Sequence, residues 1–185
     1  MKNMTFDFDI AHDIAASKHF YQFYKNTDDY ISLMMAYFRA GLEKGQACAW
    51  LVTEKIGLEE VHRLAELKIP RFLYYLCAGQ IQILSAEDWY LTNGTFDEEH
   101  ALANAQRYVE NFMKQGYHCV RLGGSCAAAA ARHDWWKFES YEQKVHEIIK
   151  GLPIIALCAY PILECSLRET KVVVDSHDDV LINHL

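Results

Sequence analysis

The stretch from residue 19 to residue 54 has the pattern of a strand, a helix and a second strand. An aromatic run over residues 19–24 comes first, and a polar turn follows at residues 25–29. Apolar residues then recur every three or four positions, as they do on one face of a helix: Tyr30, Leu33, Met34, Tyr37, Phe38 and Gly41. Residues 46–52 are a second candidate strand, apolar on both faces. Because strands of this kind need cover on both sides, the pattern predicts a buried, parallel sheet.

The turn at residues 25–29 carries helix-capping residues but no glycine. Asn26 or Thr27 can accept a free N–H group of the first helical turn, and Asp28 and Asp29 suit the positive end of the helix dipole. A phosphate-binding loop needs small residues whose backbone N–H groups surround the phosphate. Two carboxylates would instead repel a polyphosphate. The order of elements therefore resembles a nucleotide-binding unit with a degenerate nucleotide site, and nucleotide hydrolysis is not expected.

The rest of the chain alternates between helical patterns and apolar runs. Further helices are expected over residues 58–68, 71–78, 98–115 and 134–149, and further strands over 80–84, 117–122, 154–160, 171–175 and 180–183. A loop is expected at residues 85–94, and residues 95–98 fit a capping box. With residues 1–17 as an N-terminal arm and 18–185 as a single domain, the predicted fold is α/β, a three-layer sandwich around a mostly parallel central sheet.

Composition narrows the range of partners. The chain has 185 residues, a net charge of −7 and no run of Lys or Arg, so neither nucleic acid nor a membrane is expected as a direct partner. No apolar run approaches the roughly 20 residues of a membrane span. The first residues lack the apolar centre of a secretory signal, and the six cysteines then suggest free thiols in a reducing cytoplasm.

Residues spread along most of the chain together resemble one known family. They are His19, Phe23 and Tyr24; Phe38, Gly41, Leu42, Gly45 and Cys48; Trp89, Tyr90, Gly94 and Phe96; Gly116, Arg121 and Gly123; Trp136, Tyr141 and Glu142; and Cys158, Ala159 and Tyr160. Their order and spacing resemble the MEDS domain, the sensory domain named for methanogens, methylotrophs and the dichloromethane-operon repressor. The resemblance covers about residues 17–183.

This resemblance implies a fold similar to the KaiC and RecA ATPase core with the P-loop lost. It also implies signal transduction, because the family occurs in transcription regulators and sensor kinases, where it is taken to sense small molecules. This chain carries neither a helix-turn-helix nor a kinase region, so a partner regulator or kinase, or a second copy in a homodimer, is expected to receive its signal. The arm at residues 1–17 is the candidate dimer contact, since two-fold dimers are the commonest soluble oligomers.

Ligands of open α/β sheets bind beyond the carboxyl ends of the strands. Those ends are expected to carry aromatic and polar residues that suit a small organic ligand: Tyr24, Glu54, Trp89, Tyr90, Arg121, Ser125, Cys126 and Tyr160. No cofactor is expected. The simpler interpretation is that Trp89 and Tyr90 only cover the edge of the sheet.

One arginine and two histidines need partners or leave alternatives open. Arg121 lies in an apolar run that predicts a buried strand, where Glu142 or Glu54 is expected to pair with it. The alternative is that Arg121 anchors the carboxylate of a ligand. His19 and His177 can titrate near neutrality, but a single histidine is usually only packed or exposed.

The cysteines leave a second function open. Cys48, Cys119 and Cys158 fall in expected strands, where cysteine is usually a small core residue. Cys126 follows two glycines and precedes a helix, a position that can activate a thiol, and it could serve a redox switch or an enzyme with His133 as base. The spacing of the cysteines and of nine scattered histidines matches no zinc motif, so no metal is expected.

Overall fold

The computed structural model describes residues 14–126 and 135–181. Parts of four expectations lie outside these residues: the N-terminal arm up to residue 13, the base His133, the helix start at Asp134, and the end of a strand at Asn183. None of the helices in the described ranges combines the length and the apolar character needed to cross a membrane.

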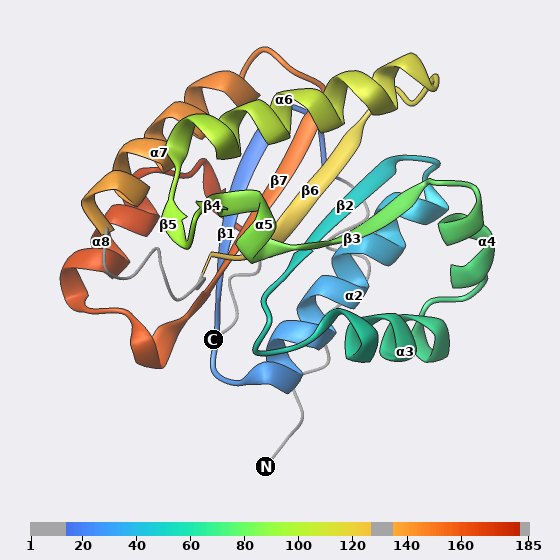
Figure 1. Ribbon diagram of the computed structural model, residues 1–185, viewed down its shortest axis with the longest axis horizontal. Coiled ribbons are helices and arrows are strands. Elements are labelled where there is room, and N and C mark those ends of the chain that lie inside the picture. Colours follow the sequence, from blue (N-terminus) through green and yellow to red (C-terminus); the bar gives the residue numbers. More distant parts are fainter. Residues whose placement is uncertain (1–13, 127–134, 182–185) are drawn as a thin grey trace.

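Six parallel strands form the central sheet in the order β3-β2-β6-β7-β1-β8 (Figure 1). In chain order they are β1 (Lys18–Tyr24), β2 (Ala47–Val52), β3 (Ile81–Ser85), β6 (Val120–Ser125), β7 (Ile154–Pro161) and β8 (Asp179–Val180). A separate antiparallel pair consists of β4 (Leu91–Thr92) and β5 (Thr95–Phe96). The strands β6 and β7 at the centre of the sheet therefore have a neighbouring strand on each side.

Helices cover both faces of the sheet (Figure 1). One face carries α2 (Thr27–Glu43), α3 (Leu58–Lys68) and α4 (Phe72–Cys77). The other carries α5 (Ala86–Tyr90), α6 (Glu98–Lys114), α7 (Trp135–Ile149) and α8 (Leu167–Asp175), with a short 3-10 turn, η1 (Ile162–Glu164), before α8. The prediction of a three-layer α/β sandwich is confirmed, because each group of helices packs on the sheet through its own apolar core.

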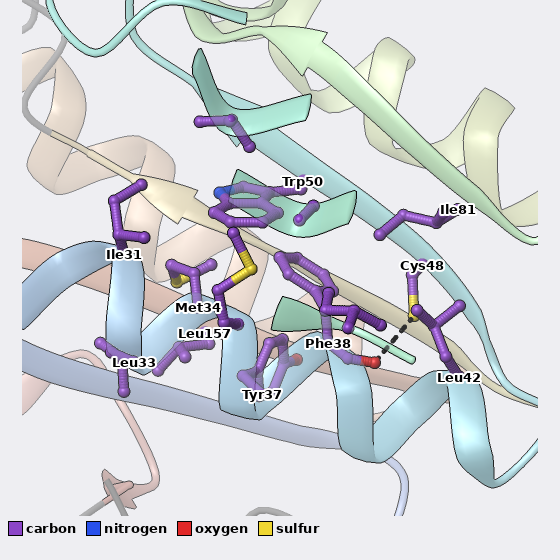
Figure 2. Packing of buried hydrophobic residues seen from close by; sticks show 14 of the residues in the cluster. Ile31, Leu33, Met34, Tyr37, Phe38, Leu42, Cys48, Trp50, Ile81 and Leu157 are labelled. Atoms are coloured by element: carbon purple, nitrogen blue, oxygen red, sulfur yellow. Dashed lines mark hydrogen bonds between the residues drawn. The ribbon is translucent and has the colours of Figure 1, made fainter. Parts of the chain in front are cut away.

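Helix α2 supplies much of the core on its face. Its N-cap is Asn26, as expected. The Asn26 side chain accepts a hydrogen bond from the Asp29 N–H in the first turn of the helix, so this N–H is not free to bind a phosphate. Figure 2 shows Tyr37 and Phe38 pointing from α2 toward the sheet, where Trp50 and Leu157 lie. Burying an apolar side chain of this size contributes about 1.5–3 kcal/mol. The predicted helix therefore packs against β2 and β7.

Residues 171–175, expected as a strand, belong to helix α8. Ser166 and Glu169 form a capping box, in which the Ser166 hydroxyl accepts the Glu169 N–H at 3.2 Å and the Glu169 carboxylate accepts the Ser166 N–H at 2.6 Å. Within α8 only Val173 is buried, which fits one helical stripe rather than the two faces of a strand. The prediction is wrong because the cap and the packing of Val173 outweigh the strand preference of valine.

The segment at residues 85–94, expected as a loop, contains helix α5 and strand β4. Asn93 and Gly94 form the turn between β4 and β5, with φ angles of 54° and 73°. Asn-Gly is the usual sequence of a two-residue hairpin turn, because both positions need positive φ. Since Thr95 pairs within this hairpin, the cap of α6 is Asp97 and the expected capping box does not form.

Strand β6 begins and ends three residues later than expected, so it includes Gly123 and Gly124. Both glycines are closely approached by neighbouring strands. A Cβ atom on Gly123 would lie 2.9 Å from the Leu157 carbonyl oxygen, and one on Gly124 would lie 2.4 Å from the Leu51 carbonyl oxygen. The missing side chains are therefore a packing requirement of the sheet and not a sign of a loop.

Replacing Gly124 with alanine should destabilise the domain, because the new methyl group would collide with backbone and cannot be accommodated by rotating a side chain. We expect a loss of roughly 1–3 kcal/mol in the free energy of unfolding, measured by urea denaturation. Gly151→Ala is the control, since a Cβ there meets no atom within 4 Å, and its effect should stay within about 0.5 kcal/mol. Equal midpoints for the two variants would contradict this account of β6.

Candidate functional site

Four side chains with proton- or metal-binding atoms meet in the core between the sheet and helices α7 and α8. We refer to His19, Glu142, Cys158 and His177 as the polar cluster. One nitrogen, oxygen or sulfur atom of each lies within 4.8 Å of those of the others. His19, Glu142 and His177 are buried, whereas Cys158 keeps some accessible surface even though protein atoms closely surround its sulfur.

Strand and helix periodicity brings these residues to one place. His19 and Tyr21 are two residues apart on β1 and face α7, and Cys158 pairs with Tyr21 on the neighbouring strand β7. Glu142 lies on the buried stripe of α7, where it interrupts a run of apolar positions. His177 follows the C-terminal end of α8. Each residue therefore comes from a different part of the chain.

The segment after α8 is held against β1 by hydrogen bonds. The Asp178 N–H donates to the His19 carbonyl at 2.8 Å, and the Asp178 carboxylate accepts the His19 N–H at 2.8 Å. Nδ1 of His177 donates to the Val173 carbonyl at 2.7 Å. This bond fixes the tautomer of the neutral ring, so Nε2 of His177 carries a lone pair, and Glu142 Oε2 lies 3.6 Å from it.

The remaining distances converge on the same point. Nε2 of His19 lies 3.4 Å from Glu142 Oε2 and 3.4 Å from Cys158 Sγ. Sγ of Cys158 lies 3.8 Å from Glu142 Oε2. The ring centroids of His19 and His177 are 4.0 Å apart. One carboxylate oxygen thus has two imidazole nitrogens and a thiol as neighbours.

Burial sets the protonation states of these groups. Desolvation raises the pKa of Glu142 to about 8, against partial opposition from neighbouring hydroxyl and thiol groups. Desolvation also lowers the pKa of His177 to about 4. It holds the pKa of His19 well below its usual value, and the nearby His177 and His146 add to that effect. At neutral pH the cluster therefore holds neutral imidazoles and a protonated carboxyl group.

Several buried polar atoms in and around the cluster lack a hydrogen-bond partner within the described ranges. They include His19 Nδ1, Glu142 Oε1, His177 Nε2, His146 Nδ1 and the Tyr160 hydroxyl. The Tyr160 hydroxyl is near enough to Glu142 to affect its pKa, but not in the geometry of a hydrogen bond. An unpaired buried group costs about 1–3 kcal/mol, and folded proteins rarely gather several of them. This concentration marks the cluster as a candidate site.

Four of the eight residues predicted to bind a ligand lie in one apolar core on the α7 face of the sheet. They are Trp89, Tyr90, Cys126 and Tyr160, of which Cys126 and Tyr160 adjoin Glu142. Further rings of this core are Phe23, Phe96, Phe138 and Tyr141. We refer to these aromatic residues, with Trp89, Tyr90 and Tyr160, as the aromatic wall.

The structure does not bring three other predicted residues to this wall. The hydroxyl groups of Tyr24 and Ser125 lie 3.0 Å apart on the opposite face of the sheet, where the Tyr24 ring packs against Tyr30 of α2. Glu54 is exposed after β2, and its backbone N–H donates to the Glu87 carboxylate at 3.1 Å. These residues do lie at the carboxyl ends of strands, but on different sides of the sheet.

Arg121 is fully buried beneath α2. Its Nε donates to Gln46 Oε1 at 2.6 Å, its Nη1 donates to the Tyr37 carbonyl at 2.9 Å, and its guanidinium lies 4.9 Å from the centre of the Tyr37 ring. Gly41 makes room for it, because a Cβ there would lie 2.6 Å from Arg121 Cδ. The prediction of a pair with Glu142 is wrong, because the sheet separates the two side chains.

No pattern in the sequence predicts that the four residues of the polar cluster meet. The sequence predicts His19 and His177 as separate packed or exposed residues, Cys158 as a core residue, and Glu142 as one candidate partner of Arg121. The available signal was local: a glutamate within an apolar helical stripe, and a histidine and a cysteine within buried strands. Which of these residues meet depends on strand order, which no local pattern specifies.

A separate hollow of about 500 Å³ lies between α6 and α7. Its lining is largely aliphatic and includes Leu102, Ala105, Val109 and Val145. Tyr141 borders both this hollow and the core that contains the aromatic wall. The hollow offers volume but few polar groups to orient a molecule, so the polar cluster is the better candidate for specific binding.

Removing the unpaired hydroxyl of Tyr160 should not destabilise the empty protein. We expect Tyr160→Phe to change the free energy of unfolding by less than about 0.5 kcal/mol, or to raise it, because no hydrogen bond is lost. Tyr37→Phe is the matched control, since the Tyr37 hydroxyl donates to the Ile155 carbonyl at 2.7 Å, and it should cost about 1 kcal/mol. Equal losses in urea denaturation would show that Tyr160 is paired.

Stability should fall as the pH rises through the range in which Glu142 loses its proton. Its pKa is about 8 in the folded protein against an ordinary 4.5, so its contribution is complete below pH 4.5 and is lost toward pH 8. The opposite contribution of His177, with a pKa of about 4 against 6.5, is complete above pH 6.5 and is lost as the pH falls. Between pH 6.5 and 8 Glu142 therefore dominates.

Over that interval the wild type should lose about 2 kcal/mol relative to Glu142→Gln, which cannot titrate. The measurement is urea denaturation of both proteins in EDTA at pH 6.5 and pH 8. His19, His146 and His177 are common to both proteins, so the difference isolates the carboxyl group. Parallel pH profiles would mean that Glu142 is already ionised at pH 6.5.

Comparison with known proteins agrees with the resemblance seen in the sequence. A family model described as MEDS, the MEthanogen/methylotroph, DcmR Sensory domain, matches residues 18–178. The matched region contains all four residues of the polar cluster. No curated protein matches the chain. Because the family match covers most of its length, the chain belongs to the MEDS family of sensory domains.

Proposed function

We propose that this domain senses a small organic molecule bound between the aromatic wall and the polar cluster, and that it carries out no reaction on that molecule. The observation that carries the proposal is the group of unpaired buried polar atoms, chiefly the Tyr160 hydroxyl and Glu142 Oε1, beside aromatic rings. Small-molecule sites commonly combine an apolar lining with a few converging polar groups. A ligand with one polar end and a small apolar body meets both requirements.

The position within the sheet supports this location. Tyr160 is next to the last residue of β7 and pairs with Phe23 near the end of β1. Cys126 directly follows β6, and its N–H donates to the Ala159 carbonyl at 3.1 Å. These are the carboxyl ends of adjacent parallel strands, the edge where open α/β sheets bind ligands. Cys158, further back on β7, keeps some accessible surface.

The chemistry of the nearest groups supports binding rather than catalysis. The pKa of the Cys158 thiol is held well above its usual value, first by its hydrogen bond with Cys126 and then by burial. Such a thiol is a weak nucleophile, because the thiolate is the reactive form. A carboxyl group that is protonated at neutral pH, as Glu142 is, cannot act there as a general base. A sensory role is also the role of the family.

A thiol redox switch is the second candidate. Cys158 packs against the apolar core that contains Cys126, and all six cysteines are free. Hydrogen peroxide would take two electrons and two protons from this pair, leaving one disulfide and two molecules of water. The base inferred for Cys126 from the sequence, His133, lies outside the described residues.

Native mass spectrometry of gently purified protein should identify a co-purifying small molecule. That molecule, or the best binder from a panel of short alcohols, aldehydes, acids and aromatic compounds, should stabilise the wild type by about 2.7 kcal/mol at a hundredfold excess over Kd. Tyr160→Phe should weaken binding, because the ligand loses a polar partner while the fold is kept. Thermal shift and calorimetry in EDTA give both quantities.

Ala105→Leu is the matched control, because it fills the hollow between α6 and α7 without touching the polar cluster. It should leave binding unchanged. Loss of binding in Ala105→Leu with full binding in Tyr160→Phe would move the site to the hollow and contradict the proposal. A response to peroxide that Cys126→Ser abolishes, in protein that binds no molecule of the panel, would favour the thiol switch.

A further inference from the structure

The polar cluster has the spacing of a closed tetrahedral metal site. Zinc binds imidazole nitrogen and carboxylate oxygen at about 2.0–2.2 Å and thiolate sulfur at about 2.3 Å, so neighbouring ligand atoms of a tetrahedron stand about 3.3–3.6 Å apart. The measured separations from Glu142 Oε2 are 3.4 Å to His19, 3.6 Å to His177 and 3.8 Å to Cys158. His19 Nε2 and Cys158 Sγ are 3.4 Å apart. These four separations fit that spacing, and the ligand atoms of all four residues lie within 4.8 Å of one another.

The His177 ring presents the correct atom to the cluster. His177 donates its Nδ1–H to the Val173 carbonyl, which leaves the lone pair of Nε2 directed into the cluster. Metal-binding histidines typically donate their other ring nitrogen to a carbonyl or carboxylate in this way, because the bond fixes tautomer and orientation. Among the described residues, Nε2 of His177 and Oε1 of Glu142 have no hydrogen-bond partner. A bound cation would give the lone pair of His177 Nε2 a partner.

Charge balance also favours a divalent cation. The thiolate of Cys158 and the carboxylate of Glu142 together carry two negative charges, and the two imidazoles are neutral ligands. A bound ion of charge +2 makes the buried site neutral overall, which avoids the cost of an isolated charge in the core. The ion enters as M²⁺, and the protons of the thiol and of the carboxyl group leave to solvent.

We propose that the polar cluster binds one divalent transition metal ion, best fitted by zinc, through His19 Nε2, Glu142 Oε2, Cys158 Sγ and His177 Nε2. Soft sulfur and imidazole ligands in a set of four select this class of ion over Mg²⁺ and Ca²⁺, which take six or more oxygen ligands. The ion would join β1, α7, β7 and the segment after α8. This goes beyond the proposed small-molecule function, because the organic molecule is proposed at the Tyr160 end and the ion at the His19 end.

The direct test uses tag-free wild-type protein with no organic ligand. After dialysis against EDTA and then against zinc sulfate or cobalt chloride, elemental analysis should find one zinc ion per chain. The cobalt form should show thiolate-to-cobalt charge-transfer absorption and the intense visible bands of a tetrahedral site. The melting temperature should rise with zinc and return with EDTA. These readouts need only the wild type, so they do not depend on whether any variant folds.

Variants then assign the ligands. Cys158→Ala should abolish the charge-transfer band, and Glu142→Gln and His177→Gln should lose the stoichiometric ion. Cys77→Ala, at an exposed cysteine of α4, and His62→Gln, on α3 across the sheet, are the matched controls and should bind like the wild type. Circular dichroism in EDTA checks that each variant is folded before the comparison is made.

Zinc well below one ion per chain, an octahedral cobalt spectrum without a thiolate band, or full binding by Cys158→Ala would overturn the metal site. The small-molecule proposal is tested separately, because its measurements are made in EDTA. Protein that binds zinc but no organic molecule would support the metal site and contradict the small-molecule function. The reverse result would leave Glu142 and His177 as polar groups for the organic ligand alone.

Discussion

An all-parallel sheet buries both of its faces, and this requirement governs the rest of the structure. On one face, α2 covers the sheet with a continuous apolar stripe that packs against β2 and β7. The close fit extends to the backbone, since Gly123 of β6 leaves no room for a side chain beneath α2. Even Arg121 on this face is satisfied by hydrogen bonds to Gln46 and Tyr37. This side of the sheet is a structural core.

The other face is built differently. Helices α5 to α8 cover it with aromatic rings, but over β1 and β7 a carboxyl group, a thiol and two imidazoles replace the aliphatic side chains that would pack there at lower cost. Several of their polar atoms lack partners among the described residues. An occupant that gave these atoms partners would recover the stability that they cost in the empty site. Because the atoms come from α7, the segment after α8 and two strands, binding would then be coupled to the positions of these elements.

Local patterns predicted the elements well where one signal dominated. The helical stripe and the Asn26 cap predicted α2, and apolar runs predicted β1, β2 and β7 close to their observed bounds. The failures came where two local signals competed. The valine run in α8 by itself favours a strand, whereas the capping box at Ser166 favours a helix and prevails. The Asn93-Gly94 turn gives a hairpin where only a loop was expected, because its two flanking strands are very short.

Local sequence patterns and general rules of α/β sheets predicted only part of the candidate site. The rule that ligands bind beyond the carboxyl ends of strands led to Tyr90, Cys126 and Tyr160, which do lie together. It could not lead to His19 or His177, since neither spacing nor composition links them to Glu142. That association follows from the position of β7 between β6 and β1 and from the fold of the chain after α8.

The amino-acid sequence by itself determined most of the helices and strands, the buried parallel sheet, and the resemblance to MEDS sensory domains. These follow from residue order, from short-range periodicity and from caps that act within a few residues. Only the tertiary structure decided which side chains meet. Strand order and register set which strands are neighbours, and the alternation of side chains along β6 directs Arg121 to the α2 face, away from Glu142. A polar cluster assembled from four distant segments has no short-range signature, because its contacts exist only once the sheet has formed.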